Sequence, residues 1–495
     1  MAVYAVVSHL KILRLFLRIV GVVTQLLISI LTYRTFRKFV TENTAFVIAV
    51  FYYNIIPKNS TVPDFSNMLL WFSTLVFLSF LEFSLNRGTS ARRPAFFLIA
   101  AGVSTSLLVL SYPTCIFVVL PGCIGIWLLS AAGARLKNLL LYFGTCGVCG
   151  LGWLTYFLCH MSFRQFLDGL SEMLTDGSHD VGLLGKLEDN LSCLGETFPY
   201  LLVALVIALV LWCFFRFVCR KNYRFFLLLI LSLILEQLFV WYRLQKHIEY
   251  PGFVYLLFPL WSIYCYFRRK KSSGEMATVY KALFWFGSIT SLFLLLAAFT
   301  ASNTMLYESA DYMAIGMLVS LCYAEWETSE SPVFWKSFIL LFVGLAIIHK
   351  GFLLYNIYGH DTIFVTRQKA EEGPMAGIYG RYSDGYEYNI RGRLLDEFIP
   401  RGSKVLIASH KSIMYLQEDY VICNYSTIST PTIDERLFQY WSLYPDKVPE
   451  YIVWDKGSEG YIATNPEVNA RLVENAELLV DDEGLLIYRL PANPY

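Results

Sequence analysis

The sequence predicts an all-α membrane protein, a polytopic bundle of about eleven transmembrane helices followed by a small extracytoplasmic α/β domain. Three observations lead to this prediction. Of the 495 residues, 56% are hydrophobic and 16% are charged, which a soluble domain does not carry over its whole length. Apolar runs of helical length recur as far as residue 357, with cationic segments between many of them. After Tyr358 the chain becomes polar and is broken by Gly and Pro. We therefore expect a multi-pass membrane domain over residues 1–357 and a second domain over residues 358–495.

Two neighbouring apolar runs, Phe65–Leu85 and Ala95–Leu110, set the orientation of the chain. The turn between them carries arginines from Arg87 to Arg93. A helix is the form in which such a run crosses a bilayer, because lipid offers no partner to an unpaired peptide group. Short cationic loops stay in the cytoplasm. The arginine turn is therefore predicted to face the cytosol, and the turn around Asp64 to face outside.

The other apolar runs extend this topology along the chain. They cover Ile12–Tyr33, Ala45–Ile56, Pro113–Ala131, Leu139–Cys159, Phe198–Val218, Phe225–Leu244, Pro251–Phe267, Tyr280–Thr300, Tyr312–Ala324 and Val333–Tyr355. The short aromatic run Ala45–Ile56 is expected to be bent or only partly spanning. With an external N-terminus, the basic segments 34–43, 87–93, 132–138, 216–224 and 268–279 all fall inside. The acidic segment 160–197 is expected to be an external polar loop, and the C-terminal domain also falls outside.

The polar C-terminal region alternates short β-rich runs with helical ones. Strands are predicted at Lys404–Ala408, Tyr420–Cys423, Tyr451–Trp454, Leu478–Val480 and Leu485–Tyr488, and helices at Lys411–Leu416, Ile433–Leu443 and Glu467–Asn475. The turn between the last two strands has hairpin chemistry. This alternation indicates a small α/β domain with a partly parallel sheet.

The chain carries none of the usual catalytic signatures. It has no GxSxG, HExxH or Walker motif, and no strand–GxGxxG–helix context surrounds Gly377 and Gly380. A net charge of +1 gives no reason to expect a nucleic-acid partner. Cys146 and Cys149 form a CxxC pair inside an apolar run, where we expect small packing residues. We assign no metal ligands, and the sequence leaves the cofactor open, with a divalent metal as one option.

Two stretches resemble the core of the C-type glycosyltransferases. The first is VPDFSNMLLWFSTLVFLSFLEFSLNRG, and the second is AAGVSTSLLVLSYPTCIFVVLPGCIGIWLL. The family shows an outer Pro and Asp before one helix, matched here by Pro63 and Asp64. A small-residue helix and a polar–Pro break follow, matched by Gly102–Leu110 and Ser111–Pro113.

Two later stretches also resemble the family. The stretch YRLQKHIEYPGFVYLLFPLW is similar to a basic outer turn followed by a returning helix. The run STISTPTIDERLFQYWSLYPDKVPEYIVWDK resembles the tail of bacterial members that assemble cell-surface polysaccharides. The resemblance implies an integral cell-membrane enzyme that takes a sugar from a polyprenyl-phosphate donor at the outer face. Its partners would then be membrane lipid, the lipid-linked sugar, and a glycan or other cell-envelope acceptor.

The family keeps an acidic catalytic residue in the first outer loop, and here the chain departs from the pattern. The run LKILRLFLRIVGVVTQLLISILTYRTFRKF resembles the family's second helix, with only Met1 to Leu10 before it. We therefore expect the first helix and its acidic loop to be absent, because the start is misplaced, the gene is truncated or the protein is a non-catalytic relative of the family. Little transferase activity is then expected from the chain as given.

Six residues are candidates for a site. Asp64 is the candidate catalytic acid, with N-capping of the following helix as its structural alternative. A basic outer turn is the candidate clamp for the donor phosphate, with snorkelling at the interface as the alternative; it contains Arg243, Lys246, His247 and Tyr250. Glu236 lies well inside an apolar run, where it would line a cavity or hydrogen bond to a neighbouring helix.

Three classes of function remain open. The first is a glycosyltransferase, which needs a carboxylate base near the acceptor and cations near the departing phosphate. The second is a non-catalytic protein that binds or scaffolds lipid-linked glycans. The third is a transporter or flippase, which paired inverted repeats with interrupted helices would favour. We see no such repeats in the sequence.

Overall fold

The computed structural model describes most of the chain in two compact units. The described residues are 13–55, 61–88, 92–174, 182–218, 220, 257–269, 274–300, 310–328, 335–336, 339–340, 343–344, 347, 367–371, 375–409, 412–425, 432–433, 435–457, 463–464 and 466–491. One unit comprises residues 20–362 and is helical where described, and the other includes residues 363–495.

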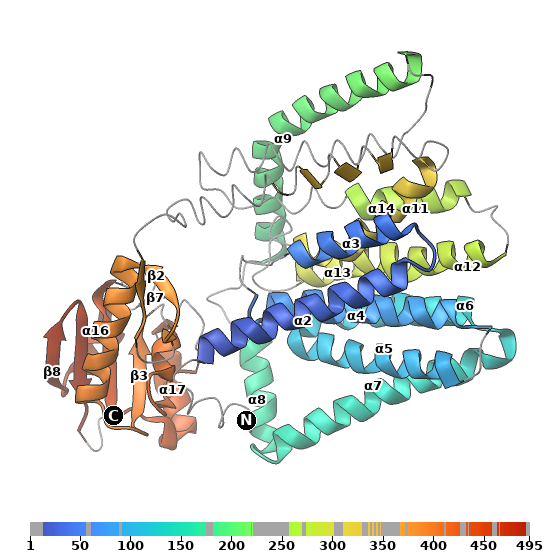
Figure 1. Ribbon diagram of the computed structural model, residues 1–495. Coiled ribbons are helices and arrows are strands. Elements are labelled where there is room, and N and C mark those ends of the chain that lie inside the picture. Colours follow the sequence, from blue (N-terminus) through green and yellow to red (C-terminus); the bar gives the residue numbers. More distant parts are fainter. Residues whose placement is uncertain are drawn as a thin grey trace. The chain divides into compact units, whose positions relative to one another are not determined.

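The helical unit is built from the apolar runs of the sequence (Figure 1). Its α-helices are α2 (Leu13–Phe36), α3 (Glu42–Asn54), α4 (Phe65–Leu85), α5 (Arg92–Ser111), α6 (Val119–Leu129), α7 (Arg135–Leu158), α8 (Phe163–Leu174), α9 (Leu183–Cys213), α11 (Leu257–Arg269), α12 (Glu275–Ala282), α13 (Thr290–Thr300) and α14 (Ala314–Thr328). Shorter segments are the 3-10 turns η2 (Pro113–Val118), η3 (Ala132–Ala134) and η8 (Ala310–Met313), and the π-helical η4 (Phe214–Val218) and η6 (Leu283–Ile289).

Five of the described helical segments are long and apolar enough to cross a membrane. They cover Phe16–Phe36, Phe65–Leu85, Arg92–Ser111, Ala132–Leu158 and Met276–Thr300. Shorter apolar segments cover Pro113–Leu129, Leu209–Val218 and Ala314–Trp326. These helices indicate a membrane protein. They do not confirm about eleven spans, because runs such as Phe225–Leu244 lie outside the described residues.

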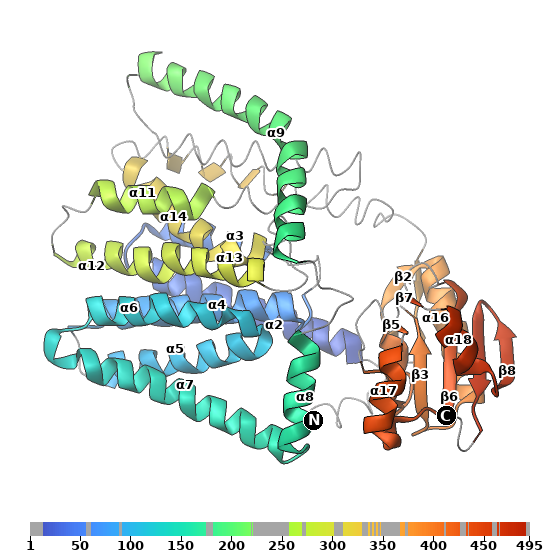
Figure 2. The ribbon, with the colours of Figure 1, turned by 180° about the vertical axis from the view of Figure 1, so that it is seen from behind.

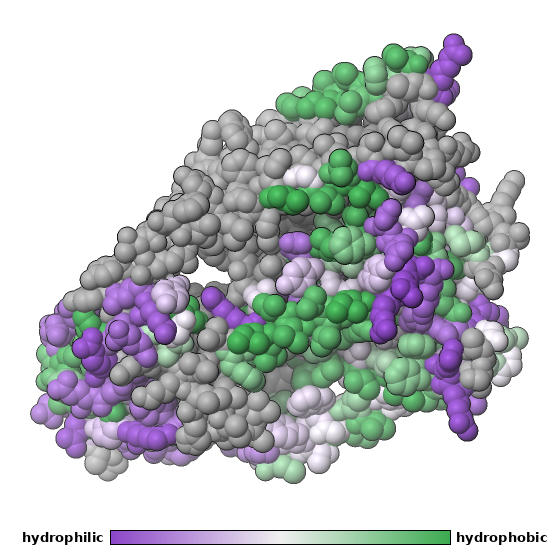
Figure 3. All heavy atoms as spheres, viewed as in Figure 1, coloured by the Kyte–Doolittle hydropathy of each residue, from purple (hydrophilic) through white to green (hydrophobic). Residues whose placement is uncertain are grey.

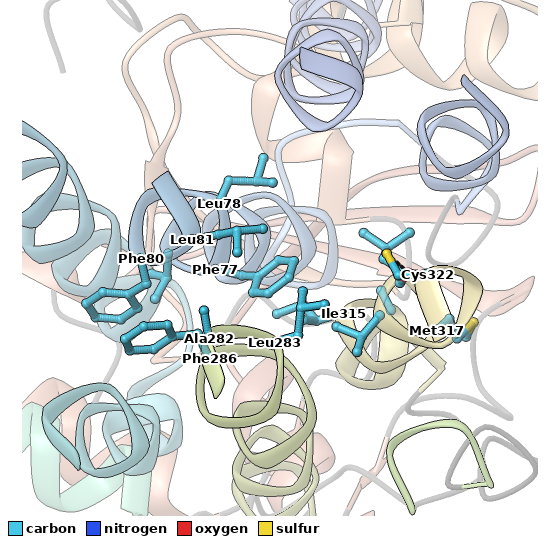
Figure 4. Close-up of a cluster of buried hydrophobic side chains, with 14 of the residues drawn as sticks. Phe77, Leu78, Phe80, Leu81, Ala282, Leu283, Phe286, Ile315, Met317 and Cys322 are labelled. Carbon is cyan, nitrogen blue, oxygen red and sulfur yellow. Dashed lines mark hydrogen bonds between the residues drawn. The ribbon is translucent and has the colours of Figure 1, made fainter. Parts of the chain in front are cut away.

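Helix α4 is the centre of the helical unit. Most of its side chains are buried, and the helix contacts α5 on one side and η6, α12 and α14 on the other. Phe80 of α4 stacks on Phe286 of η6 with ring centroids 4.5 Å apart (Figure 4). On α6, a Cβ placed on Gly125 would lie only 2.3 Å from the Phe286 ring. A glycine at position 125 therefore allows α6 to approach this aromatic pair.

Small residues bring α5 and α7 into close contact. A Cβ on Gly102 would lie 2.8 Å from Cβ of Thr145. Thr105 and Tyr142 share a hydrogen bond of 3.0 Å between their hydroxyls, and the Cys146 thiol donates to the carbonyl of Gly102. The structure thus gives Cys146 a packing contact, as the sequence predicted for the CxxC pair.

The segment 160–197 is not the polar loop that the sequence predicted. Helix α8 occupies residues 163–174, and α9 already begins at Leu183. The prediction was wrong because it relied on the abundance of acidic residues and overlooked the spacing of the leucines between them.

Buried carboxylates hold the connection between α2 and α3 at the opposite end of the unit from Asp64. Glu82 of α4 accepts hydrogen bonds from Thr35 and Lys38. Glu325 of α14 accepts from the backbone N–H of Thr41, the N-cap residue of α3. Hydrophilic atoms gather at the end of the unit where α2 ends, beside a hydrophobic band along that helix (Figure 3). This end holds Arg87 and Arg92 and is the one predicted to face the cytosol.

The second unit is an α/β unit built on a five-stranded mixed sheet. Its strands are β3 (Lys404–Ala408), β4 (Val421–Ile422), β6 (Tyr451–Asp455), β8 (Glu477–Asp482) and β9 (Leu485–Arg489), in the order β4-β3-β6-β9-β8. Strand β3 runs parallel to both β4 and β6, whereas β9 runs antiparallel to β6 and β8. The predicted strands and the partly parallel sheet are therefore present, and no strand end differs from its predicted position by more than two residues.

Helices cover both faces of this sheet. The other elements are β1 (Arg367–Lys369), β2 (Tyr379–Arg381), β5 (Thr432–Ile433), β7 (Ala463–Thr464), α16 (Tyr382–Phe398), η10 (Ser412–Leu416), α17 (Glu435–Leu443), η11 (Pro445–Lys447) and α18 (Pro466–Val473). Side chains of α16 and η10 pack on one face of β3 and β6, and those of α17 and α18 pack on the other. Alternate residues of each strand thus enter different cores.

Candidate functional site at the Asp64 end of the helical unit

Asp64 caps the first turn of α4. Its backbone is extended, and Oδ1 accepts hydrogen bonds from the Asn67 backbone N–H at 2.8 Å and from its side-chain Nδ2 at 2.9 Å. These bonds satisfy one of the N–H groups that a helix leaves without a partner at its start. Among the described residues, none donates a hydrogen bond to Oδ2. The half-buried carboxylate is therefore held by one oxygen.

Close backbone packing fixes the turn that carries Asp64. A Cβ on Gly21 of α2 would lie 1.4 Å from the carbonyl oxygen of Thr61, so only glycine fits there. Gln25, one helical turn further on, donates to the carbonyls of Tyr52 and Ile55 and accepts from Nε1 of Trp71. This buried amide connects α2 to the end of α3 and to α4. The three helices are therefore fixed to one another next to the turn that carries Asp64.

Three aromatic rings contact one another in sequence, starting from Phe65, the residue after Asp64. Phe65 stacks on Tyr112 with centroids 6.1 Å apart, and Tyr112 meets Tyr312 edge to face at 5.9 Å. Tyr112 ends up here because Pro113 cannot continue helix α5, and η2 begins at that proline. Ser111–Pro113, the polar–Pro break of the sequence, therefore lies at the Asp64 end.

A lysine also reaches this end of the unit. Lys186 of α9 is buried, and its Nζ donates to the carbonyl of Phe299 near the end of α13 at 3.3 Å. Thr114, two residues after Tyr112, donates to the carbonyl of Ala297 in the same helix. These two bonds place the ammonium at the same end of α13 as the aromatic group.

Of the six candidate residues from the sequence, only Asp64 lies among the residues that the structure describes. Asp64 is placed as above, and both its capping and an open carboxylate oxygen are compatible with the geometry. The other candidates, Glu236, Arg243, Lys246, His247 and Tyr250, lie outside the described residues. Within the described ranges, no group of three or more His, Cys, Asp or Glu side chains could hold a metal ion.

The sequence prediction missed three contributors to this end. Lys186 stands alone among acidic residues, and Tyr312 begins an apolar run, so neither drew attention. Gln25 gave a usable signal, because an amide inside a long apolar run predicts a hydrogen bond to a neighbouring helix. Together the residues present a carboxylate oxygen, an ammonium and aromatic faces. A carboxylate can accept a proton, and aromatic rings offer a flat apolar surface to a ligand.

Comparison with known proteins gives only a coarse likeness. No protein-family model matches the chain, and no curated protein matches it. One similar solved structure is an oligosaccharyltransferase of Archaeoglobus fulgidus in complex with zinc and sulfate. It is 13% identical at a TM-score of 0.40, and the match covers 97% of this chain and 62% of that one. A second is the archaeal oligosaccharyltransferase AglB of the same organism, in complex with an inhibitory peptide and a dolichol-phosphate. It is 12% identical at a TM-score of 0.41, with 97% and 64% covered. The chain thus spans less than two thirds of either structure, and the likeness does not extend to individual residues.

Proposed function

We propose that the chain is an integral-membrane glycosyltransferase that transfers a sugar from a polyprenyl-phosphate donor to a cell-envelope acceptor at the outer face. Asp64 would then serve in place of the acid that the family keeps in its first outer loop, and the chain would be active, contrary to the expectation of little activity from the sequence. The observation that carries this proposal is the orientation of the Asp64 carboxylate and the hydrogen bonding of its two oxygens. One oxygen is held by Asn67, which fixes the orientation of the group. The other lies at the bundle end that also holds Tyr112 and Lys186.

Asp64 is the proposed general base. As an acceptor hydroxyl attacks the anomeric carbon, Oδ2 takes its proton, and the bond from that carbon to the phosphate oxygen breaks with its electron pair leaving on the phosphate. A positioned base of this kind contributes roughly 100- to 10,000-fold in rate. Because Asn67 holds Oδ1, the carboxylate keeps this orientation without acceptor.

Cations are proposed to stabilise the departing phosphate. The sequence places Arg243, Lys246 and His247 in one basic turn, with Tyr250 beside them, and we propose this turn as the phosphate clamp. Glu236 is proposed to line the cavity for the lipid-linked substrate. The α/β domain, proposed over residues 358–495, would lie on the outer side of the membrane.

The test compares two substitutions at position 64 in the full chain. Purified protein in vesicles is given a panel of radiolabelled polyprenyl-phosphate hexoses and pentoses with envelope oligosaccharides as acceptors. Asp64→Asn keeps an oxygen that can cap α4 but removes the base, so we expect unchanged thermal stability and loss of transfer. Asp64→Ala removes both the cap and the base, and should also lower stability by about 1 kcal/mol. Asp168→Asn, a change of an exposed acid on α8, is the control.

The same assay distinguishes sugar transfer from the alternative function, binding of lipid-linked glycans without catalysis. Asp64 already has a structural reason to be present, since it caps α4, and this observation favours a protein that binds lipid-linked glycans without catalysis. Binding of the labelled donor with no transfer in any combination would support that alternative. Transfer that persists in Asp64→Asn would remove Asp64 from the mechanism.

A further inference from the structure

Helix α8 leaves the direction of the membrane-spanning helix that precedes it. Helix α7 ends at Leu158, and α8 begins at Phe163 and runs across the direction of α7 in both views (Figures 1 and 2). A reciprocal cap starts α8, because the Gln165 backbone N–H donates to Ser162 Oγ while the Gln165 side chain accepts from the Ser162 N–H. The change of direction is therefore encoded locally.

Apolar residues occupy one side of α8. Phe163, Phe166 and Leu167 are spaced by three and four residues, and positions 170 and 174 continue the leucine pattern in the sequence. Phe166 packs on Phe157 of α7 with ring centroids 5.8 Å apart. Phe163 and Leu167 remain 57% and 46% exposed. The polar side carries Arg164 and Asp168, an (i, i+4) charge pair. At Phe163 and Leu167, therefore, the described residues do not cover the apolar stripe of α8.

The first part of α9 repeats this arrangement. Leu184, Leu187 and Leu191 recur at helical spacing and are 81%, 47% and 57% exposed. Lys186 lies on the other side of the helix, is buried, and donates to the carbonyl of Phe299. This bond fixes which side of α9 faces α13, so the three leucines point away from it.

Aromatic residues mark the level at which α7 leaves the membrane. Trp153 and Tyr156 lie edge to face with centroids 6.1 Å apart, and His160 packs on the Tyr156 ring at 4.6 Å. Trp and Tyr gather where a spanning helix meets the headgroups. Helix α8 begins three residues after His160, so its start lies at the same level.

We propose that α8 and the first part of α9 lie in the plane of the bilayer surface at the Asp64 end, with both apolar stripes in the boundary between headgroups and acyl chains. The occupant of these stripes is membrane lipid, because only residues 159–162 connect α8 to α7, an apolar helix of membrane-spanning length that the unit leaves largely uncovered. Of the side chains of α7, only Tyr142 is buried in the unit. Acidic residues outnumber basic ones in both segments, so the contact is apolar and independent of anionic lipid.

In this arrangement α8 and the first part of α9 form a layer of helices at the membrane surface, called the shelf below, beside the candidate site. Lys186 connects the shelf to the end of α13, and Thr114 connects that end to the turn next to Tyr112. The inference rests on helix direction, spacing and exposure, and holds whether or not Asp64 is a catalytic base.

Photocrosslinking from the full chain tests the inference. The photoreactive residue p-benzoylphenylalanine replaces Leu167 or Leu187 on the apolar stripes, and Arg164 on the polar side of α8 serves as the matched control. Each variant is reconstituted into phosphatidylcholine vesicles that contain a tritiated lipid, and the folded fraction is isolated by size exclusion. We expect several-fold more lipid label at positions 167 and 187 than at 164, with no change when anionic lipid is added.

Two results would overturn the inference. Equal lipid labelling at positions 164 and 167 would mean that α8 has no lipid-facing side. Crosslinks from positions 167 and 187 to protein, either to a second copy or to the α/β unit, would show that protein and not lipid covers the stripes.

Discussion

Arg391 and Asp455 form an ion pair, with Nη1 of the guanidinium 2.9 Å from Oδ2 of the carboxylate, and both side chains are buried within the α/β unit. The same carboxylate accepts from Ser409 Oγ at 2.8 Å and from the Gly457 backbone N–H at 3.0 Å. Asp455 ends β6 and Ser409 follows β3, so these residues meet at the carboxyl ends of two parallel strands. The cluster ties helix α16 to the centre of the sheet.

Removal of the Asp455 charge should destabilise the α/β unit strongly. Asp455→Asn removes the negative charge that faces the buried guanidinium, and breaking a buried ion pair costs roughly 3–5 kcal/mol. Hydrogen exchange of the β3 and β6 amides in the full chain measures this loss. Asp419→Asn breaks the exposed pair with Arg401 and is the matched control, for which only a small change is expected. Equal protection in the two variants would contradict the prediction.

A methyl group at Gly125 should disturb the centre of the helical unit. Gly125→Ala forces the Phe286 ring away from α6 and from Phe80, and such overpacking costs about 1–3 kcal/mol. Thermal denaturation in detergent should therefore begin at a lower temperature. Gly147→Ala on α7 has no atom within 4 Å of the new methyl and should leave the transition unchanged or raise it. A harmless Gly125→Ala would show that the aromatic pair adapts freely.

Cys423 should be inert to thiol reagents in the folded protein. Burial is the largest cause that raises the pKa of its thiol to about 12, from 9.0. Only the thiolate reacts, so labelling at pH 8 should require unfolding of the α/β unit. Cys159, which is exposed, is the matched control and should label at once.

The same pKa shift predicts a pH dependence of stability. Between pH 9 and pH 12 the unfolded chain loses the Cys423 proton while the folded chain keeps it. The stability of the α/β unit should therefore fall as the pH rises through this window and show no contribution from this thiol below it. Cys423→Ser removes the buried thiol, so the fall over this window should become shallower in that variant.

The side of the membrane on which residues 360–495 lie follows from the positions of the basic loops. Residues 360–495 are expected to lie outside the cytoplasm. A reporter that works only in the cytosol, fused after Tyr495, should be silent. The same reporter inserted after Gly88, in the basic turn, should be active. Activity of the C-terminal fusion would mean that the proposed topology is wrong.

A different basic segment, residues 243–250, is expected to hold the donor phosphate. Replacing Arg243, Lys246 and His247 with neutral residues should weaken binding of a polyprenyl-phosphate sugar, by roughly 1.5–3 kcal/mol for each charge-assisted hydrogen bond that the substitution removes. Expression and membrane insertion should not change. Unchanged donor affinity in the triple variant would leave only interfacial snorkelling as the role of these cations.

The elements formed by continuous apolar runs were predictable from the sequence. The run Phe65–Leu85 has the same bounds in the sequence and in the structure, and so does β3. Asp64 was predictable as an N-cap, because it immediately precedes an apolar run. Such features depend on neighbouring residues alone.

Contacts between distant residues were not predictable in the same way. Arg391 and Asp455 look like ordinary surface charges in the sequence, and they pair only because the sheet places α16 next to the end of β6. Tyr112 and Tyr312 meet through the packing of η8 on α4. The helices within 160–197 were missed because abundant charge was given more weight than leucine spacing, and interfacial helices carry both.

The order of strands in the α/β unit has a consequence for biosynthesis. Strand β9, the last described strand along the chain, lies between β6 and β8 instead of at an edge. β6 therefore has an open hydrogen-bonding side until residues 485–489 have been synthesised and delivered to the compartment where the unit folds. Pairing of strands so far apart in the chain is slow relative to local helix formation. While the ribosome is still translating, β6 thus presents an unprotected strand edge, and a chaperone that holds extended segments would act at this stage.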